Sequence, residues 1–174
     1  PEIEDFHMPA PGVAHNLLIV KIRKSYPGQG KKVISSLSGA GQMMFTKYLV
    51  VVSGEINIRN YKELVLHILK NTDFRIDLLL SAGPLDVLDH SSDTYSLGGK
   101  LGIDGTIKLE EELPAGHPAY SPGKSLNTIP GIINIEKFIG EYRSVNLLND
   151  LPVLIIGLNQ SEDPSSVEKS KRRL

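Results

Sequence analysis

The hydrophobic residues of this chain fall into short, unbroken runs rather than into long alternating patterns. Residues 48–53 are almost entirely apolar and contain three consecutive valines, Val50, Val51 and Val52. A β-branched run without polar alternation is typical of a strand that is covered on both faces. Residues 16–23 have the same character. The pattern therefore predicts two buried strands, the second of them at the centre of a sheet.

Segments with helical periodicity follow each of these strands. Residues 31–40 place apolar side chains at helical spacing after a glycine-rich turn, and residues 61–71 carry a single apolar face. Asn60 is a good N-cap for the second helix, and Glu63 stands three residues later, where a capping box has an acid. Two strands joined through a helix predict a parallel pair.

A third apolar run, residues 76–80, completes a βαβαβ order over residues 16–80. This order predicts an α/β layered domain, with a mostly parallel or mixed central sheet covered by helices. Asp, Ser and Gly dominate residues 84–108, which we predict to form an ordered loop without a helix or a long strand. Towards the C-terminus, residues 134–143 favour a short helix and residues 151–158 favour a last strand.

We expect three parts along the chain. Residues 1–108 form the α/β core, residues 109–160 form an extension packed on the same domain, and residues 161–174 form a polar tail. The chain begins at Pro1 without an initiating methionine, so we expect it to be a piece of a longer protein.

Composition narrows the class of protein. The chain has 174 residues, of which 40% are hydrophobic and 22% are charged, and a formal net charge of −1. These values are typical of a globular protein and predict no basic surface for nucleic acid. The absence of cysteine excludes disulfides, cysteine zinc sites and a thiol nucleophile. No apolar run reaches the roughly 20 residues of a transmembrane segment and no signal-peptide pattern opens the chain, so we predict a cytoplasmic protein.

A glycine-rich turn could suggest phosphate binding, and one histidine could suggest a metal site. Residues 27–31 read Pro-Gly-Gln-Gly-Lys, but they lack the upstream glycine and the hydroxyl residue of a phosphate-binding loop, which favours a tight turn before a helix. His90 stands near Asp86, Asp89 and Asp93, a set that suits several divalent cations. Turn hydrogen bonds explain this spacing better, and we predict no metal ligand here.

The turn that leads into the central strand carries the most informative side chains. Met43, Met44 and Phe45 suit either core packing or a soft wall for a flat aromatic ligand. Lys47 is a lone cation at the mouth of a buried strand, so it has to find an anion or reach solvent. Lys100, in a Gly-Gly-Lys segment, raises the same question.

Three blocks stand in order and at consistent separations: NLLIVKIRKSYPGQGKKV, QMMFTKYLVVVSGEINIRN and LDHSSDTYSLGGKLGIDGTIK. Together they resemble the C-terminal domain of the UbiD-like decarboxylases, the carboxy-lyases of ubiquinone and menaquinone biosynthesis and their relatives. The resemblance runs from Pro1 to about Lys108, and residues 109–174 match the family less clearly.

The resemblance implies a non-oxidative decarboxylation of an aromatic or α,β-unsaturated acid. It also implies prenylated FMN as cofactor, with manganese and a potassium ion. In that family the catalytic Glu-Arg-Glu set and the metal ligands lie in upstream domains, which include a flavin-binding split barrel. For this chain the resemblance therefore implies no catalytic residue, no metal ligand and no cofactor bound to the isolated domain. Its partners would be the upstream flavin-binding domain and further copies in a homo-oligomer.

The same resemblance assigns roles to a few residues. The segment 42–47 matches the block that approaches flavin and substrate, so Met44 and Thr46 are expected in the wall of the substrate pocket. Lys47 matches a basic position of that block and is expected to bind the cofactor, facing its phosphate, or to have a structural role. Asn71 stands where many relatives have an arginine, in a pattern like TRxDPxRD.

Two other interpretations stay open from the sequence. The first is a stand-alone, non-catalytic α/β domain for interaction or oligomerisation. The second is a mononucleotide-binding α/β module, which only the glycine-rich turns suggest.

Overall fold

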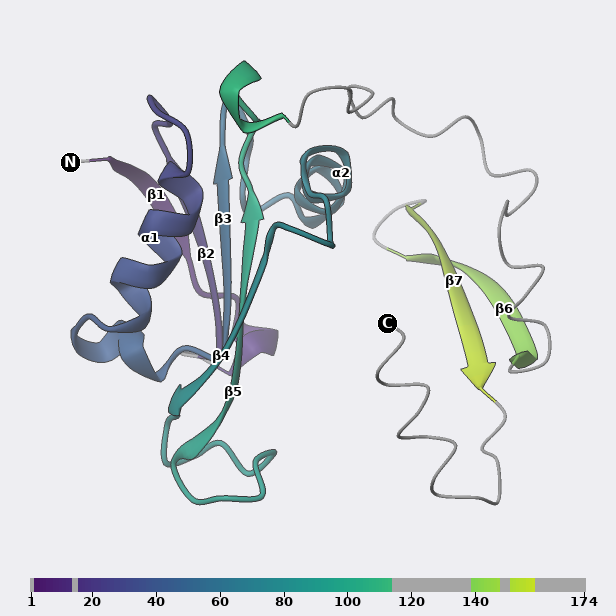
Figure 1. The fold of residues 1–174 in the computed structure, drawn as a ribbon. Coiled ribbons are helices and arrows are strands. Elements are labelled where there is room, and N and C mark those ends of the chain that lie inside the picture. The colour runs from purple at the N-terminus through teal and green to yellow at the C-terminus, as the bar shows by residue number, and fades with distance from the viewer. Residues whose placement is uncertain (1, 14–15, 114–138, 148–150, 159–174) are drawn as a thin grey trace. The chain divides into compact units, whose positions relative to one another are not determined.

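A five-stranded sheet with the strand order β1-β2-β3-β5-β4 organises the first part of the chain (Figure 1). The computed structural model describes residues 2–13, 16–113, 139–147 and 151–158. The strands of the sheet are β1 (Ile3–His7), β2 (Leu17–Ile22), β3 (Tyr48–Ser53), β4 (Leu78–Pro84) and β5 (Leu97–Gly105).

The three inner strands of the sheet are parallel and the two edge strands are antiparallel. β2 pairs with β3 from Leu17 opposite Tyr48 onwards, and β3 pairs with β5 from Tyr48 opposite Leu101 onwards. β1 and β4 run against their neighbours. The predicted α/β class with a mixed sheet is confirmed, and so is the parallel pairing of the first two predicted strands.

One helix covers each face of this sheet, as Figure 1 shows for α1 (Gln29–Ser38) and α2 (Tyr61–Asn71). Successive residues of the buried strands point to opposite faces, so both faces are apolar. The core on the α1 face contains Leu18, Val20, Ile22, Val33, Ile34, Leu49 and Val51. The core on the α2 face contains Ile19, Val50, Val52, Ile56, Ile58 and Leu64.

The third predicted strand forms, but its direction differs from that of a repeated crossover. β4 begins at Leu78 and is antiparallel to β5, so it starts at the end of the sheet where β3 finishes. Figure 1 shows α2 end-on, across the strands rather than along them. Because α2 does not carry the chain back to the other end of the sheet, the next strand has to run in the opposite direction. The predicted N-cap of α2 is present, since the Asn60 side chain accepts a hydrogen bond from the Glu63 amide at 3.3 Å.

The prediction that residues 84–108 contain no long strand is wrong, because β5 is a nine-residue strand between β3 and β4. Glycine disfavours strands and hides the apolar pattern, and β5 contains glycine at 98, 99, 102 and 105. At two of these positions only glycine fits, because a Cβ would overlap a neighbouring residue. A Cβ on Gly102 would overlap Ile34 of α1, and one on Gly98 would overlap Leu85 and Ser92. Gly98 and Gly102 therefore mark positions where neighbouring side chains lie directly against the strand.

The chain divides into two compact units, Pro1–Pro122 and Gly123–Leu174. In the second unit, β6 (Ile139–Leu147) pairs antiparallel with β7 (Leu151–Leu158). The last predicted strand is confirmed as β7. The predicted helix over 134–143 is wrong for residues 139–143, because pairing with β7 satisfies their backbone groups, and residues 134–138 lie outside the described residues.

The predicted extension at 109–160 and tail at 161–174 stay predictions. Of the helices that the structure describes, neither α1 nor α2 is long and apolar enough to cross a membrane.

The close approach of α1 to β5 predicts different effects for two glycines of one strand. Gly102→Ala should lower the free energy of unfolding by about 1–3 kcal/mol, because the branched Ile34 side chain cannot move aside freely. Gly99→Ala is the matched control, since a Cβ there meets nothing within 4 Å, and it should leave stability unchanged or slightly raised. Urea denaturation measures both. Equal effects of the two substitutions would contradict the close packing.

Candidate functional site

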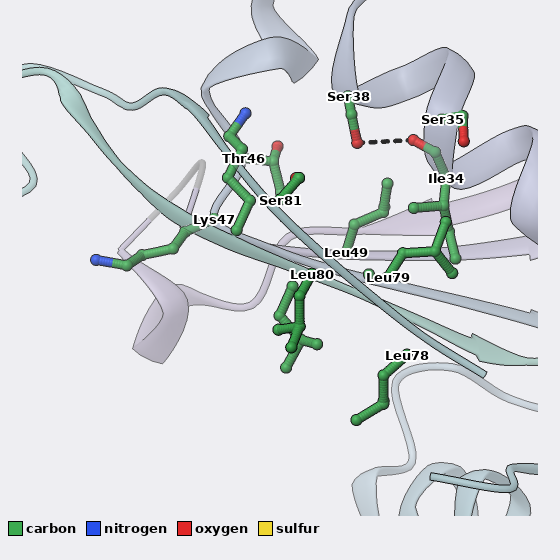
Figure 2. A pocket seen from close by; sticks show the side chains of 13 residues that line it. Ile34, Ser35, Ser38, Thr46, Lys47, Leu49, Leu78, Leu79, Leu80 and Ser81 are labelled. Carbon is green, nitrogen blue, oxygen red and sulfur yellow. Dashed lines mark hydrogen bonds between the residues drawn. The ribbon is translucent and has the colours of Figure 1, made fainter. Parts of the chain in front are cut away.

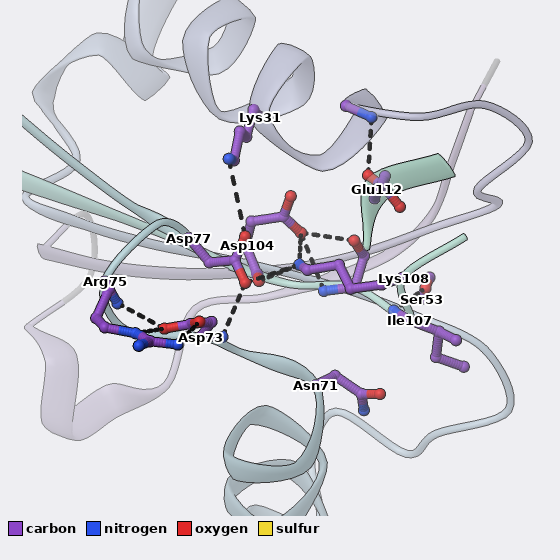
Figure 3. A network of polar contacts seen from close by, with 12 residues as sticks. Lys31, Ser53, Asn71, Asp73, Arg75, Asp77, Asp104, Ile107, Lys108 and Glu112 are labelled. Carbon is purple, nitrogen blue, oxygen red and sulfur yellow. Dashed lines mark hydrogen bonds and ion pairs between the residues drawn. The ribbon is translucent and has the colours of Figure 1, made fainter. Parts of the chain in front are cut away.

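Polar side chains gather where β3 and β5 end, and they form a network of charges (Figure 3). The Lys108 ammonium lies 3.3 Å from carboxylate oxygens of both Asp104 and Asp77. Lys31 of α1 lies 3.8 Å from Asp77. Both carboxylates are almost fully buried, so the cations offset the cost of their burial. These groups bind one another and fix the chain after β5.

The Asp104 carboxylate lies directly beneath the first turn of α1. Its Oδ1 accepts hydrogen bonds from the Thr106 amide at 3.1 Å and the Thr106 hydroxyl at 2.6 Å. A Cβ on Gly30 would overlap this carboxylate, so only glycine lets the helix approach it. The anion stands at the helix N-terminus, where the backbone amides favour negative charge.

A second buried pair closes the same end of the sheet. Lys24 donates to Glu112 and, at 2.9 Å, to the Thr106 hydroxyl. Glu112 also accepts hydrogen bonds from the amides of Gly28 and Leu109, each at 2.8 Å. Burial alone would raise the pKa of Glu112, but the hydrogen bonds from Lys24 and the two amides outweigh it and hold the pKa below its ordinary value. The glycine-rich turn at 27–31 therefore binds a carboxylate of the chain itself.

At the opposite end of the sheet, the turn Gly41–Phe45 leads into β3, and Lys47 has its anion within the chain. The Lys47 ammonium lies 2.8 Å from Asp89, 2.6 Å from the Ser91 hydroxyl and 3.4 Å from the Ser92 hydroxyl. The hydrogen bond from Lys47 and those from Ser91 hold the pKa of Asp89 well below its usual range. The pair connects the start of β3 to the loop between β4 and β5.

Two of the three aspartates near His90 make the turn hydrogen bonds that their spacing predicts. Asp86 accepts from the Leu88 amide at 2.9 Å, and Asp89 accepts from the Ser91 amide at 2.8 Å. Within the described residues, no three His, Asp or Glu side chains come together as metal ligands.

A pocket of about 430 Å³ opens between α1 and the β4–β5 edge of the sheet (Figure 2). Its apolar walls and polar groups are contributed by Ile34, Ser35, Ser38, Thr46, Lys47, Leu49, Leu78, Leu79, Leu80, Ser81, Lys100, Leu101 and Gly102.

The pocket brings together two of the three residues that the sequence assigned to a site. Thr46 and Lys47 both line it, although the Lys47 side chain points away from the other labelled residues in Figure 2. Met44 is not among the lining residues, but its carbonyl accepts a hydrogen bond from the Lys100 ammonium. The assignments of Met44 and Thr46 to a substrate pocket and of Lys47 to a cofactor stay predictions.

The sequence reasoning missed the partners of the charged residues. Asp89 lies 42 residues from Lys47, and Glu112 lies 88 residues from Lys24. No local spacing signals pairs so far apart, so only the folded sheet reveals them.

Comparison with known proteins identifies the family. Residues 1–105 match the family described as the 3-octaprenyl-4-hydroxybenzoate carboxy-lyase C-terminal domain. The chain belongs to this family. The match covers the whole five-stranded sheet and confirms the resemblance to the C-terminal domain of UbiD-like decarboxylases.

Relatives of the family are much longer than this chain. An uncharacterised protein of Archaeoglobus fulgidus is 43% identical over 113 residues, which is 64% of this chain and 24% of that protein. One of Aquifex aeolicus is 42% identical over 112 residues, which is 64% of this chain and 23% of that protein. The chain thus spans about a quarter of the length of these relatives.

Solved structures show the same fold. The UbiD-class enzyme HmfF from Pelotomaculum thermopropionicum, in complex with FMN, is similar with a TM-score of 0.58 and 25% identity, over 79% of this chain and 28% of that one. Vanillic acid decarboxylase from Sedimentibacter hydroxybenzoicus, in closed form, has a TM-score of 0.60 at 19% identity, over the same shares. The second likeness is one of fold alone.

The buried Lys24–Glu112 pair predicts a pH-dependent contribution to stability. Glu112→Gln should lower the free energy of unfolding at pH 7 by about 1–3 kcal/mol, because it weakens hydrogen bonds to a charged acceptor. The folded-state pKa of Glu112 lies below its unfolded value, so its stabilisation is present above about pH 4.3 and is lost as pH falls through the folded-state pKa.

Urea denaturation of both proteins between pH 7 and pH 3 checks this expectation. The difference between wild type and Glu112→Gln should shrink below about pH 4. Glu111→Gln, at the exposed neighbouring residue, is the control and should change little at any pH. A difference that persists unchanged at low pH would mean that the charge of Glu112 does not stabilise the fold.

Proposed function

We propose that this chain is the C-terminal domain of a longer, prenylated-FMN-dependent decarboxylase that acts non-oxidatively on an aromatic or unsaturated carboxylic acid in quinone biosynthesis. The family match over residues 1–105 carries the proposal. The FMN complex of the UbiD-class relative HmfF supports the cofactor class. When bound, prenylated FMN would supply the group at which the carboxylate is lost, together with manganese and potassium.

In this proposal, the catalytic residues lie in the part of the enzyme outside this chain. The chain spans about a quarter of the length of its relatives, so most of the enzyme lies outside it. The domain covers one side of the active site, contacts the upstream flavin-binding domain of the same chain and supports a homo-oligomer in the cytoplasm. Large apolar side chains on β4 and the following loop support a covering role, because Leu80, Val87, Leu88 and Tyr95 are all exposed.

Lys47 would meet the cofactor phosphate through an exchange of partners. An ammonium has three donors, and Asp89, Ser91 and Ser92 already accept from Lys47. A phosphate can therefore bind Lys47 only by replacing at least one of these acceptors. Thr46 and Met44 stand on the same turn and would form the substrate wall beside it.

Activity tests the proposal directly. The complete protein, supplied with prenylated FMN, should release carbon dioxide from an aromatic or unsaturated acid, and the 174-residue chain alone should neither release it nor retain a yellow cofactor. A complete protein that binds no flavin and has no activity would favour the other interpretation, a non-catalytic domain for interaction or oligomerisation. Activity of the isolated chain would contradict the assignment of the chemistry to the remainder.

The exchange of partners at Lys47 predicts opposite effects on cofactor retention for substitutions of Lys47 and Asp89. In the complete enzyme, Lys47→Ala should lower cofactor retention more than it lowers the melting temperature, because a phosphate contact is lost. Asp89→Asn should keep or raise cofactor retention, since it frees Lys47 from a competing carboxylate. Flavin absorbance after gel filtration and thermal unfolding measure the two quantities. If both variants lose stability equally and retain the cofactor, the pair is structural.

A further inference from the structure

Lys100 of β5 is a buried cation without a carboxylate beside it. The residue is only 8% exposed, and its ammonium donates a hydrogen bond to the Met44 carbonyl. In the part of the chain that the structure describes, no carboxylate lies within ion-pair distance of this ammonium. Burial therefore lowers the pKa of Lys100, because no nearby negative charge favours its charged form.

Lys24, at the other end of the sheet, shows the contacts of a buried lysine that stabilises this domain. Its side chain is 4% exposed, and its ammonium donates to the Glu112 carboxylate and the Thr106 hydroxyl. Lys100 also has three donors, but its acceptor is a neutral carbonyl. Such a carbonyl does not offset the removal of a charge from water. We therefore expect the charge of Lys100 to destabilise the fold.

The hydrogen bond from Lys100 attaches the turn Gly41–Phe45 to β5. None of the five residues of this turn is buried, although Met43 packs against the core as a partly buried residue. The Met43 amide donates to the Ala40 carbonyl at 2.9 Å, and the Thr46 amide donates to the Met43 carbonyl at 3.0 Å. These hydrogen bonds join near neighbours, so they shape the turn without fixing its position on the sheet.

Two successive residues of β5 hold the two ends of one short segment. The Lys100 ammonium binds the Met44 carbonyl, and the Leu101 amide donates to the Lys47 carbonyl at 2.9 Å. Thr46 lies between these two attachments. It is 5% exposed, and its hydroxyl has no hydrogen-bond partner among the described residues. Its position is therefore set by the backbone on either side of it.

We propose that Lys100 is a positioning residue of the substrate site. Its ammonium holds the Met44 carbonyl and thereby fixes the places of Met44 and Thr46, although its buried charge destabilises the fold. A methionine would fill the same space without a charge, but it could not bind the carbonyl. The role of the turn as a substrate wall rests on the proposed function, whereas its attachment by Lys100 does not.

Lys100→Met in the complete enzyme tests the effect on stability. The melting temperature should stay unchanged or rise, because methionine keeps the length of the side chain and removes a buried charge. Lys24→Met is the matched control at a second buried lysine. It should lower the melting temperature, since it leaves the Glu112 carboxylate buried without its cation. If Lys100→Met melts at a lower temperature or does not fold, Lys100 stabilises the domain and the proposal is wrong.

Hydrogen exchange of the same proteins measures the attachment of the turn. In Lys100→Met, the amides of Met43 and Thr46 should exchange about tenfold faster or more, because the turn opens more often once the Met44 carbonyl is released. Lys70→Met, at an exposed lysine of α2, should leave these rates unchanged. Exchange that is as slow in Lys100→Met as in wild type would overturn the proposal whatever the activity.

Steady-state kinetics of the complete enzyme test the link to the substrate site. With 4-hydroxybenzoate as the probe, Lys100→Met should raise KM about tenfold and change kcat less, because a displaced wall weakens binding of the ground state and the transition state alike. Lys70→Met should change neither. Faster exchange of the turn with an unchanged KM would overturn the positioning role. An inactive wild type would contradict the proposed function, and the exchange rates alone would then decide whether Lys100 holds the turn.

Discussion

The close packing of α1 on β5 is the contact on which the rest of the domain depends. Gly102 of the strand lies beneath Ile34 of the helix, and Gly30 of the helix lies above Asp104 of the strand. Because a side chain is absent from one partner at each crossing, the helix lies nearer to the sheet than a larger residue would allow. Its first turn reaches the charge network after β5, and its last turns line the pocket at the other end.

The charged side chains at the two ends of the sheet have different partners. Where β3 and β5 finish, the carboxylates and ammonium groups of the chain pair with one another, and backbone amides of the α1 turn complete the set. At the opposite end, the Lys47 ammonium pairs with the Asp89 carboxylate, whereas the Lys100 ammonium donates to the Met44 carbonyl. Among the described residues, the first end pairs its charges but leaves one buried oxygen of Asp104 without a hydrogen bond, and the second leaves the Thr46 hydroxyl without one.

The limits of sequence reasoning follow from the same features. The valine-rich β3 and the capped α2 could be predicted from the sequence, because their signals lie in neighbouring residues. β5 was missed because its four glycines hide the strand pattern, and the reason for one of them, Gly102, is its contact with Ile34, some seventy residues earlier in the chain. The direction of β4 depends on how α2 lies across the sheet, which no short pattern encodes. Lys47 was recognisable as a residue in need of an anion, but its partner Asp89 follows from the fold alone.

The strand order also limits how this domain can fold during its synthesis. β5 is the last of the five strands to be synthesised, yet it lies between β3 and β4. Until it leaves the ribosome, β3 has an open hydrogen-bonding edge and β4 has no neighbour in the sheet. β4 can therefore join the sheet only together with β5 or after it, because β5 is its neighbour. Nascent chains that stall before residue 105 would carry a bare apolar edge, which is a substrate for chaperones.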